Sequence, residues 1–287
     1  MALRALKKIR TVVRTLNPRE VERMAQRSFT IGILAGQEPA YESVMRFLLP
    51  SGMREPAAGR IVRVADPSDF DRCDFGFTES HVDGIPRFYP FDPHHPEKVI
   101  NQFLDDHEDL WLPVAREFER FRSAVVERLI FQVARENAAF AVASALPNIA
   151  PLLFQLPWAV GEFASDTVVL TMNQIRLAFL IAAAKNAPVG FTEQKGQIAS
   201  ITAGAFGWRA LAREMVSKAP FGTGLIPKGL IAFAGTYVVG IGLERYLCEG
   251  RFLTAEQKRE HYAGAYERGR SVVVPMVERF RARRAAV

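Results

Sequence analysis

The stretch NAAFAVASALPNIAPLLFQLPWAVG, residues 137–161, contains no charged side chain and opens an apolar block that continues to residue 250. At helical rise this stretch is long enough to cross a bilayer, but Pro147, Pro151 and Pro157 would break a single helix. Two interpretations stay open. The block forms kinked or re-entrant membrane segments, or it forms the core helices of a soluble bundle.

The composition of the 287-residue chain points to two domains with an uneven distribution of charge. A charged fraction of 24% and an apolar fraction of 49% exclude a disordered or collagen-like chain. The net charge of +6 arises largely in residues 1–27. Apolar spacing in residues 1–16 predicts a basic amphipathic helix, which would lie on anionic lipid or dock on its own domain. The two cysteines, Cys73 and Cys248, fit a reducing cytoplasm better than a disulfide framework.

Residues 28–110 have the pattern of a small α/β domain. The run FTIGILAG, residues 29–36, predicts a buried strand, and residues 41–49 have helical spacing after a short turn. Three more short strands are expected at residues 60–65, 74–78 and 85–89, between Asp, Pro, Ser and Gly clusters. The order of strand, loop and helix is that of a phosphate-binding loop.

The candidate loop departs from the working pattern G-x-x-x-x-G-K-[ST] at two positions. Aligned on Gly36, the chain has Tyr41 at the second glycine and Glu42 at the lysine, and keeps only Ser43. A side chain where the backbone must approach phosphate, and a carboxylate where lysine belongs, oppose nucleotide binding. We therefore expect neither nucleotide hydrolysis nor a cofactor, although an ordinary strand-to-helix turn explains the residues equally well.

Other residues of chemical interest lack the partners that would make a site. Asp74-Phe75-Gly76 spells a kinase triplet without the remaining kinase motifs. Histidines could bind a metal, but adjacent ones point apart, and acidic runs are usually solvated, so we expect no metal site at His94, His95 or His107. No Ser, Thr or Cys stands in a nucleophile motif. We expect a protein without enzymatic activity.

The helical half carries features that we interpret as packing devices. From residue 111 one apolar stripe continues for more than thirty residues and predicts a single long helix. Asp166 and Asn173 share a helix face and predict a buried polar network. Small residues at steps of four predict two helices that touch along small-residue ridges, one formed by Ala199, Ala203 and Gly207 and the other by Ala232, Thr236 and Gly240.

Three segments resemble the domain of unknown function 697 family: DTVVLTMNQIRL from Asp166, PFGTGLIP from Pro220 and AGTYVVGIGLERYLCEG from Ala234. The resemblance covers about residues 135–255. This family is similar to the C-terminal region of YcjF-type inner-membrane proteins and to tails of some Era-like bacterial GTPases. The resemblance implies a bacterial, membrane-associated protein with a GTPase-like front domain, and it brings no catalytic residues with it.

Together these observations predict an α+β protein in four segments. We expect basic amphipathic helices over residues 1–27, a degenerate α/β domain with a phosphate-loop-like start over residues 28–110, an apolar helical domain over residues 111–255 and a charged helical tail over residues 256–287. The expected function is that of a membrane-associated scaffold or regulatory protein at the cytoplasmic face of the inner membrane. Its partners would be lipid and a protein or second copy, and not nucleic acid. The alternatives are a membrane-linked GTPase with an atypical loop and a soluble helical interaction protein.

Overall fold

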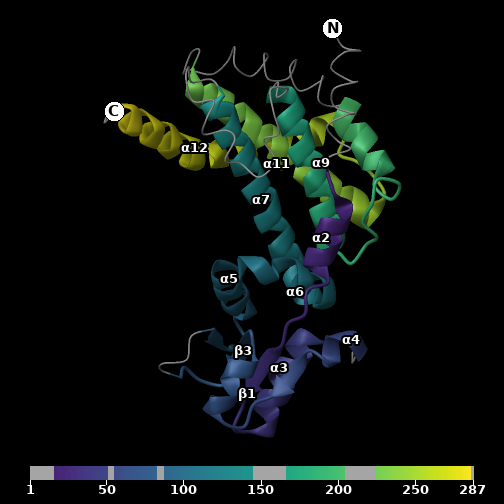
Figure 1. Ribbon diagram of the computed structural model, residues 1–287, viewed down its shortest axis with the longest axis vertical. Helices are drawn as coiled ribbons and strands as arrows, with labels where there is room; N and C mark the ends of the chain where they lie inside the picture. Colours follow the sequence, from purple (N-terminus) through teal and green to yellow (C-terminus); the bar gives the residue numbers. More distant parts are fainter. Residues whose placement is uncertain (1–15, 51–54, 83–86, 145–165, 204–223, 286–287) are drawn as a thin grey trace. The chain divides into compact units, whose positions relative to one another are not determined.

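A computed structural model describes residues 16–50, 55–82, 87–144, 166–203 and 224–285 (Figure 1). The predicted amphipathic helix at residues 1–16 lies almost wholly outside the described residues. The chain forms two compact units: an α/β unit of residues 19–127 and 182–188, and a helical unit of residues 1–18, 128–181 and 189–287. The α+β prediction is confirmed. The boundary between the units lies at residue 127 rather than at residue 110, and the charged tail belongs to the helical unit.

The α/β unit contains a parallel sheet of four strands in the order β2-β1-β3-β4. All four predicted strands are present, although each is shorter than its apolar run: β1 (Ile31–Leu34), β2 (Ile61–Arg63), β3 (Phe75–Thr78) and β4 (Phe88–Pro90). The chain leaves β1 toward β2 and then crosses to β3 on the other side of β1. The carboxyl ends of β1 and β3 therefore form the point at which the strand order reverses, where open α/β sheets usually bind ligands.

One face of the sheet packs on helices through an aromatic core. Phe75 and Phe77 of β3 are fully buried, and the Phe75 ring lies 4.6 Å from the ring of Phe103, centre to centre. Phe47 packs edge to face on Phe77 at 6.0 Å and on Phe121 at 5.9 Å. The helices of this unit are α2 (Pro18–Ala25), α3 (Glu38–Leu48), α4 (Glu55–Ala58), α5 (Pro96–Asp106), α6 (Trp111–Glu117) and the start of α7 (Glu119–Ala143).

The other face of the sheet is covered by an aromatic layer that fits only over glycine residues. Gly32 and Gly76 are paired across β1 and β3, and the ring of Phe88 lies over both. A Cβ at Gly76 would stand 2.1 Å from the Phe88 ring and 2.4 Å from the Gly32 carbonyl oxygen. Phe70 completes this layer, with its ring 3.9 Å from that of Phe88. Two small residues in register thus allow an aromatic layer to cover a sheet of only four strands.

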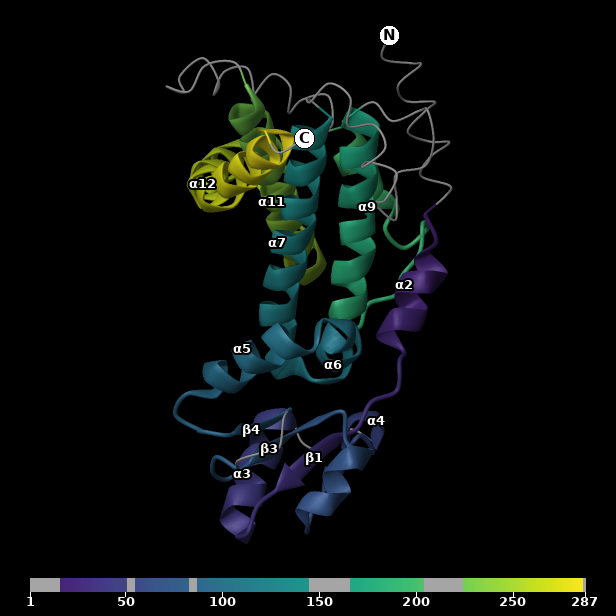
Figure 2. The same ribbon diagram turned by 60° about the vertical axis from the view of Figure 1, so that its left-hand side comes forward.

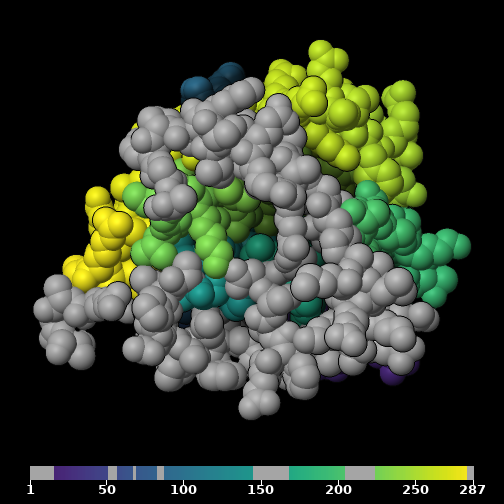
Figure 3. All heavy atoms as spheres, turned by 90° about the horizontal axis from the view of Figure 1, so that it is seen from above, coloured from purple at the N-terminus to yellow at the C-terminus, as the bar shows by residue number. Residues whose placement is uncertain are grey.

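The helical unit is built on the second part of α7, on α9 (Asp166–Ala184) and on α11 (Leu225–Glu249), with α12 (Ala255–Ala285) against α11. Figures 1 and 2 show α7, α9 and α11 side by side. The C-terminal end of α7 and the start of α11 lie together, because Lys228 Nζ donates to Ser144 Oγ at 3.1 Å. Figure 3 views the unit from this end, with α11 in green beside α7 in teal.

Helix α12 is not only a solvated tail. Its Tyr262, Val273 and Val277 are fully buried, and Gly269 lies so close to α11 that a Cβ would stand 2.9 Å from the Phe233 ring. The Arg268 guanidinium lies over the Tyr237 ring, 5.5 Å from its centre. The charged residues predicted for this tail lie on one side of the helix, while the other side covers α11.

Within the described part of the chain, α11 is the one helix long and apolar enough to cross a membrane, with 25 residues and a mean hydropathy of 1.5 in its most apolar window. Of that window, 67% is buried among neighbouring helices. The helix ends at Gly250, whose positive φ of 70° suits glycine, and the Gly250 amide donates to the Tyr246 carbonyl at 2.8 Å. The proline-containing segment, residues 145–165, lies outside the described residues.

The single long helix predicted from residue 111 is wrong in one respect. Phe118 has an extended backbone, with φ −109° and ψ 109°, and separates α6 from α7. Arg122 holds the end of α6, since its Nε donates to the Ala115 carbonyl at 3.0 Å and its Nη2 donates to the Arg116 carbonyl at 3.2 Å. The predicted apolar stripe is nevertheless buried on both sides of the break: Val114, Phe118, Phe121, Val125, Leu129 and Val133.

The contact between α7 and α11 generates a prediction about Gly240. A Cβ there would stand 2.7 Å from both γ carbons of Ile130, so Gly240→Ala should lower the free energy of unfolding by about 1–3 kcal/mol despite the better helix propensity of alanine. Thermal or chemical unfolding measures the change. Gly264→Ala is the matched control because a Cβ at this position of α12 would have nothing within 4 Å, and it should be neutral or stabilising. Equal effects of the two substitutions would contradict this packing.

Candidate functional site

The carboxyl edge of the sheet is the first candidate site, because β1 and β3 end there at the reversal of strand order. The chain passes from β1 to α3 through residues 35–37 alone. At this edge the Gly36 amide donates to Glu79 Oε2 at 3.2 Å, and Glu79 follows directly after β3. A backbone amide that could donate to an anionic ligand thus donates to a carboxylate of the protein itself.

The electrostatics of α3 reinforce this arrangement. Glu38 stands in the first turn of α3 and binds Arg63 at 2.7 Å between Oε2 and Nη1, and the Arg63 guanidinium lies 4.6 Å from the centre of the Tyr41 ring. A helix N-terminus attracts negative charge, and here Glu38 and Glu79 supply it. A phosphate group would meet the Glu79 carboxylate and the Glu38–Arg63 ion pair at this edge.

The four residues of the predicted degenerate loop do not form one loop. Gly36 lies in the turn, but Tyr41, Glu42 and Ser43 lie inside α3, where the Tyr41 amide donates to the Gln37 carbonyl at 3.2 Å. A phosphate-binding loop wraps several free backbone amides around its ligand before the helix begins. With α3 starting at Glu38, the amides from Tyr41 onward are already used in the helix, so the connection has the form of an ordinary strand-to-helix turn.

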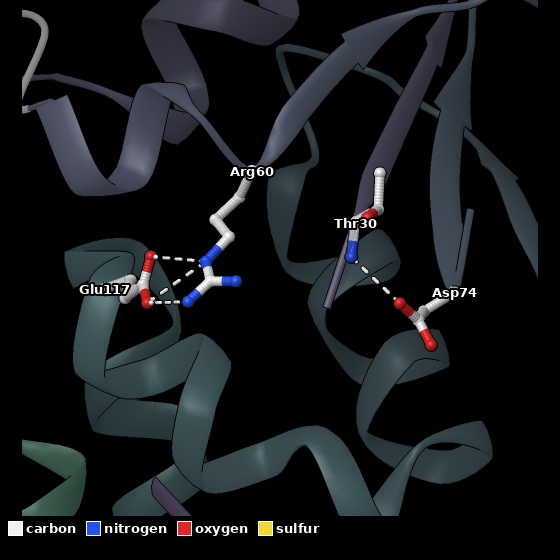
Figure 4. Close-up of polar contacts among 4 residues, drawn as sticks. All are labelled: Thr30, Arg60, Asp74 and Glu117. Carbon is white, nitrogen blue, oxygen red and sulfur yellow. Dashed lines mark hydrogen bonds and ion pairs between the residues drawn. The ribbon is translucent and has the colours of Figure 1, made fainter. Parts of the chain in front are cut away.

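The opposite, amino edge of the sheet has a different character (Figure 4). Asp74 joins β3 to β1, because the Thr30 amide donates to Asp74 Oδ2 at 2.8 Å and the Asp74 amide donates to the Thr30 carbonyl at 3.0 Å. Arg60, directly before β2, binds Glu117 of α6 through Nε, at 3.3 Å to both carboxylate oxygens, and through Nη2 at 3.1 Å. The Arg60 guanidinium also lies 5.3 Å from the centre of the Phe29 ring.

A buried polar network joins three helices of the helical unit. Asn137 of α7 donates from Nδ2 to the Thr236 hydroxyl of α11 at 2.8 Å, and its Oδ1 accepts from Asn173 Nδ2 of α9 at 2.7 Å. Gln174 Nε2 lies 3.4 Å from the same hydroxyl. All four residues are buried. Such a network fixes the register of its helices because a shift would leave buried amides without partners.

Asn173 therefore belongs to a network, as the sequence suggested, but with partners that the sequence did not single out. The side chain of Asp166, its predicted partner, lies outside the described residues. Asn137 and Gln174 carried a signal, since they are uncharged amides within apolar helices. Their common partner Thr236 carried no such signal in the sequence, because its spacing from other small residues on α11 predicts a packing role for it.

The two small-residue ridges have different surroundings. On α11, Ala232 is buried, Thr236 binds Asn137, and Gly240 contacts Ile130 of α7. Ala199 and Ala203 lie on a helix at residues 195–203 and are exposed. Gly207 lies outside the described residues, so contact between the two ridges stays a prediction.

The histidines lie in two different environments, and no group of three or more metal-binding side chains occurs among the described residues. His94 and His95 are exposed, and His95 Nδ1 lies 3.1 Å from Glu97. His107 is buried, with its ring 5.5 Å from that of Phe103, and its Nε2 has no hydrogen bond within the described part of the chain. Burial lowers the pKa of His107 below 6.5, although Asp106 and Asp109 act in the opposite direction.

Comparison of the chain with family models, curated proteins and solved structures gave no match. The resemblance to the domain of unknown function 697 family stays a prediction from the residues quoted for it.

The environment of His107 predicts the pH dependence of stability. Because the native state holds His107 neutral while the unfolded chain takes up a proton near pH 6.5, the unfolded state binds more protons below that pH. The free energy of unfolding should therefore fall as the pH drops below 6.5, with a contribution from His107 of up to about 1.4 kcal/mol per pH unit. Chemical unfolding at several pH values between about 7 and 5 measures this slope.

His107→Phe should reduce that slope, since phenylalanine fits among the neighbouring rings and does not titrate. His94→Gln, which removes an exposed histidine, is the control and should leave the slope unchanged. An identical slope in the wild type and His107→Phe would contradict the assignment.

Proposed function

We propose that this chain is a membrane-associated scaffold or regulatory protein without enzymatic activity, whose front unit is a degenerate relative of GTPase-like domains. The observation that carries the proposal is the hydrogen bond between the Gly36 amide and the Glu79 carboxylate. It puts a negative charge of the protein at the edge where a nucleotide-binding sheet holds phosphate. The parallel sheet and the order β1, turn, α3 support a common origin with such domains.

Membrane association is supported by α11 and by the basic start of the chain. Helix α11 has the length and hydropathy of a membrane span. Its packing against α7 through Thr236 and Gly240 is typical of helices that approach closely at small residues in lipid. We place the protein at the cytoplasmic face of an inner membrane, because its two cysteines are free and residues 1–27 carry the charge that anionic headgroups attract.

A soluble helical interaction protein is the second candidate, and burial favours it. In the described part of the helical unit, Phe191 is the one large hydrophobic side chain that is exposed, and 67% of the apolar window of α11 is covered. A helix whose apolar surface is already buried by protein does not need lipid.

Membrane fractionation separates the two candidates. After expression of the full chain, we expect it to stay in the membrane pellet through a wash with alkaline carbonate, because a spanning helix is not released by breaking electrostatic contacts. A lipid-bound peripheral protein pellets with the membranes and is released only by the wash, whereas a soluble protein is already in the supernatant before the wash. Recovery of the chain in that first supernatant would favour the interaction protein.

Nucleotide binding tests the other half of the proposal. Equilibrium dialysis with labelled GTP and Mg²⁺ should show no saturable binding in the micromolar range. Glu79→Gln removes the carboxylate charge but leaves the short connection at residues 35–37, so it should not create binding. Micromolar binding by the wild type, unimproved by Glu42→Lys, would contradict the proposal and indicate an atypical GTPase.

A further inference from the structure

A cavity of about 420 Å³ lies within the α/β unit at the amino edge of the sheet, away from the carboxyl edge discussed above. Its lining comes from parts of the chain that are distant in sequence: Gln26, Arg60, Arg116, Glu117, Arg122 and Asn186. The methyl groups of Ala25 and Ala57 add small apolar surfaces. The volume lies within the usual range of small-molecule sites.

The lining has a surplus of positive charge. Arg60, Arg116 and Arg122 stand against one carboxylate, that of Glu117, which leaves a formal surplus of two positive charges. Glu117 forms an ion pair with Arg60, and 27% of the Arg60 side chain and 15% of the Glu117 side chain are exposed. The Glu117 carboxylate therefore neutralises Arg60, and the charges of Arg116 and Arg122 have no carboxylate in the lining to balance them.

Each of the three arginines has N–H groups that donate no hydrogen bond within the described residues. In Figure 4 the Arg60 guanidinium turns Nε and Nη2 toward Glu117, while its third nitrogen points away. Arg122 uses Nε and Nη2 for the end of α6, and its Nη1 has no hydrogen bond within the described residues. Arg116 is half-buried, and its guanidinium has no hydrogen bond or ion pair in the part of the chain that the structure describes.

A half-buried guanidinium without a partner is costly, and an oxyanion removes that cost by accepting its hydrogen bonds. Two of the three guanidinium groups are already held in place, that of Arg60 by Glu117 and that of Arg122 by two backbone carbonyls. A ligand therefore loses less side-chain entropy when it binds here than at a group of mobile surface arginines.

We propose that this cavity binds a small phosphate monoester through Arg60, Arg116 and Arg122. A phosphate monoester carries a charge of about −1.5 to −2 near pH 7, which matches the surplus of the lining, and its oxygens suit guanidinium forks. The cavity is larger than a phosphate group alone needs. The side-chain amides of Gln26 and Asn186 can bind hydroxyl groups of the esterified part.

The backbone at Asn186 fits a positioned binding residue. Asn186 has a positive φ of 55°, in the left-handed region that asparagine tolerates better than most residues, and its amide donates to the Ala183 carbonyl at 3.0 Å. This turn holds the Asn186 side chain at the cavity. Asn186→Gly keeps the backbone conformation and removes only the side-chain amide.

The test is isothermal titration calorimetry of the full chain with three soluble probes: glycerol 3-phosphate, inorganic phosphate and succinate. We expect glycerol 3-phosphate to bind more tightly than inorganic phosphate, and more weakly as salt is added. Arg116→Gln should raise its Kd roughly tenfold or more, because a charged hydrogen-bond donor is lost. Asn186→Gly should raise the Kd for glycerol 3-phosphate but not for inorganic phosphate.

Arg120→Gln is the matched control, since Arg120 is an exposed arginine of the same unit that does not line the cavity, and it should leave the Kd unchanged. Because the Arg116 guanidinium bonds to no other described residue, Arg116→Gln should also keep the wild-type unfolding temperature, which separates a binding defect from misfolding. Absence of binding by the wild type, equal effects of the two Arg→Gln changes, or tighter binding of succinate would each overturn the proposal.

A phosphate monoester also occurs as the headgroup of phosphatidic acid, and a second arm identifies the source. Flotation with phosphatidylcholine vesicles, with and without phosphatidic acid, is compared for the wild type and Arg116→Gln. If glycerol 3-phosphate binds and Arg116→Gln leaves flotation unchanged, the ligand is a free metabolite. If Arg116→Gln removes the effect of phosphatidic acid, the same arginines recognise a lipid headgroup. Both results support phosphate recognition by Arg116.

Discussion

The hydrogen bond from the Gly36 amide to the Glu79 carboxylate, 3.2 Å long, holds a negative charge at the carboxyl edge of the sheet. An anionic ligand there would have to displace Glu79 from Gly36 and stand beside the Glu38–Arg63 ion pair at the start of α3. The cavity at the amino edge has the opposite character, because three arginines line it together with one carboxylate, that of Glu117. The α/β unit thus has the Glu79 carboxylate at the edge where open α/β sheets usually bind ligands, and guanidinium groups at the other edge.

The strands could be predicted from the sequence because each is a short run of β-branched and aromatic residues between turn residues. The order of the strands in the sheet could not be predicted, since pairing joins residues distant in the chain.

The break between α6 and α7 at Phe118 could not be predicted from the sequence either. Phe118 and Phe121 both point into the core, so the apolar period continues across the break, and only Arg122 bonding to two carbonyls reveals where α6 ends. Asp74-Phe75-Gly76 has a structural role and not that of a kinase triplet. Asp74 accepts a hydrogen bond from the Thr30 amide, Phe75 is a buried core ring, and Gly76 leaves room for the Phe88 ring.

The candidate sites were less predictable than the fold, for a similar physical reason. Tyr41 and Glu42 argue against phosphate binding from the sequence alone, but Glu79, which bonds the loop amide, lies 43 residues further along and carries no motif. Arg60, Arg116 and Asn186 converge only after folding. In the helical unit the buried amides of Asn137 and Asn173 could have been noticed as polar residues in apolar helices, yet their pairing depends on how α7, α9 and α11 pack.

The Gly36 amide itself reports most directly on the central claim that a protein carboxylate holds the place of a phosphate. In nuclear magnetic resonance spectra of the isotopically labelled chain, we predict that Glu79→Gln moves the Gly36 amide signal, because the charged acceptor of that amide is lost, and that excess GTP with Mg²⁺ leaves the wild-type signal in place. A Gly36 signal that is unchanged by Glu79→Gln but shifts and saturates with GTP would contradict the claim.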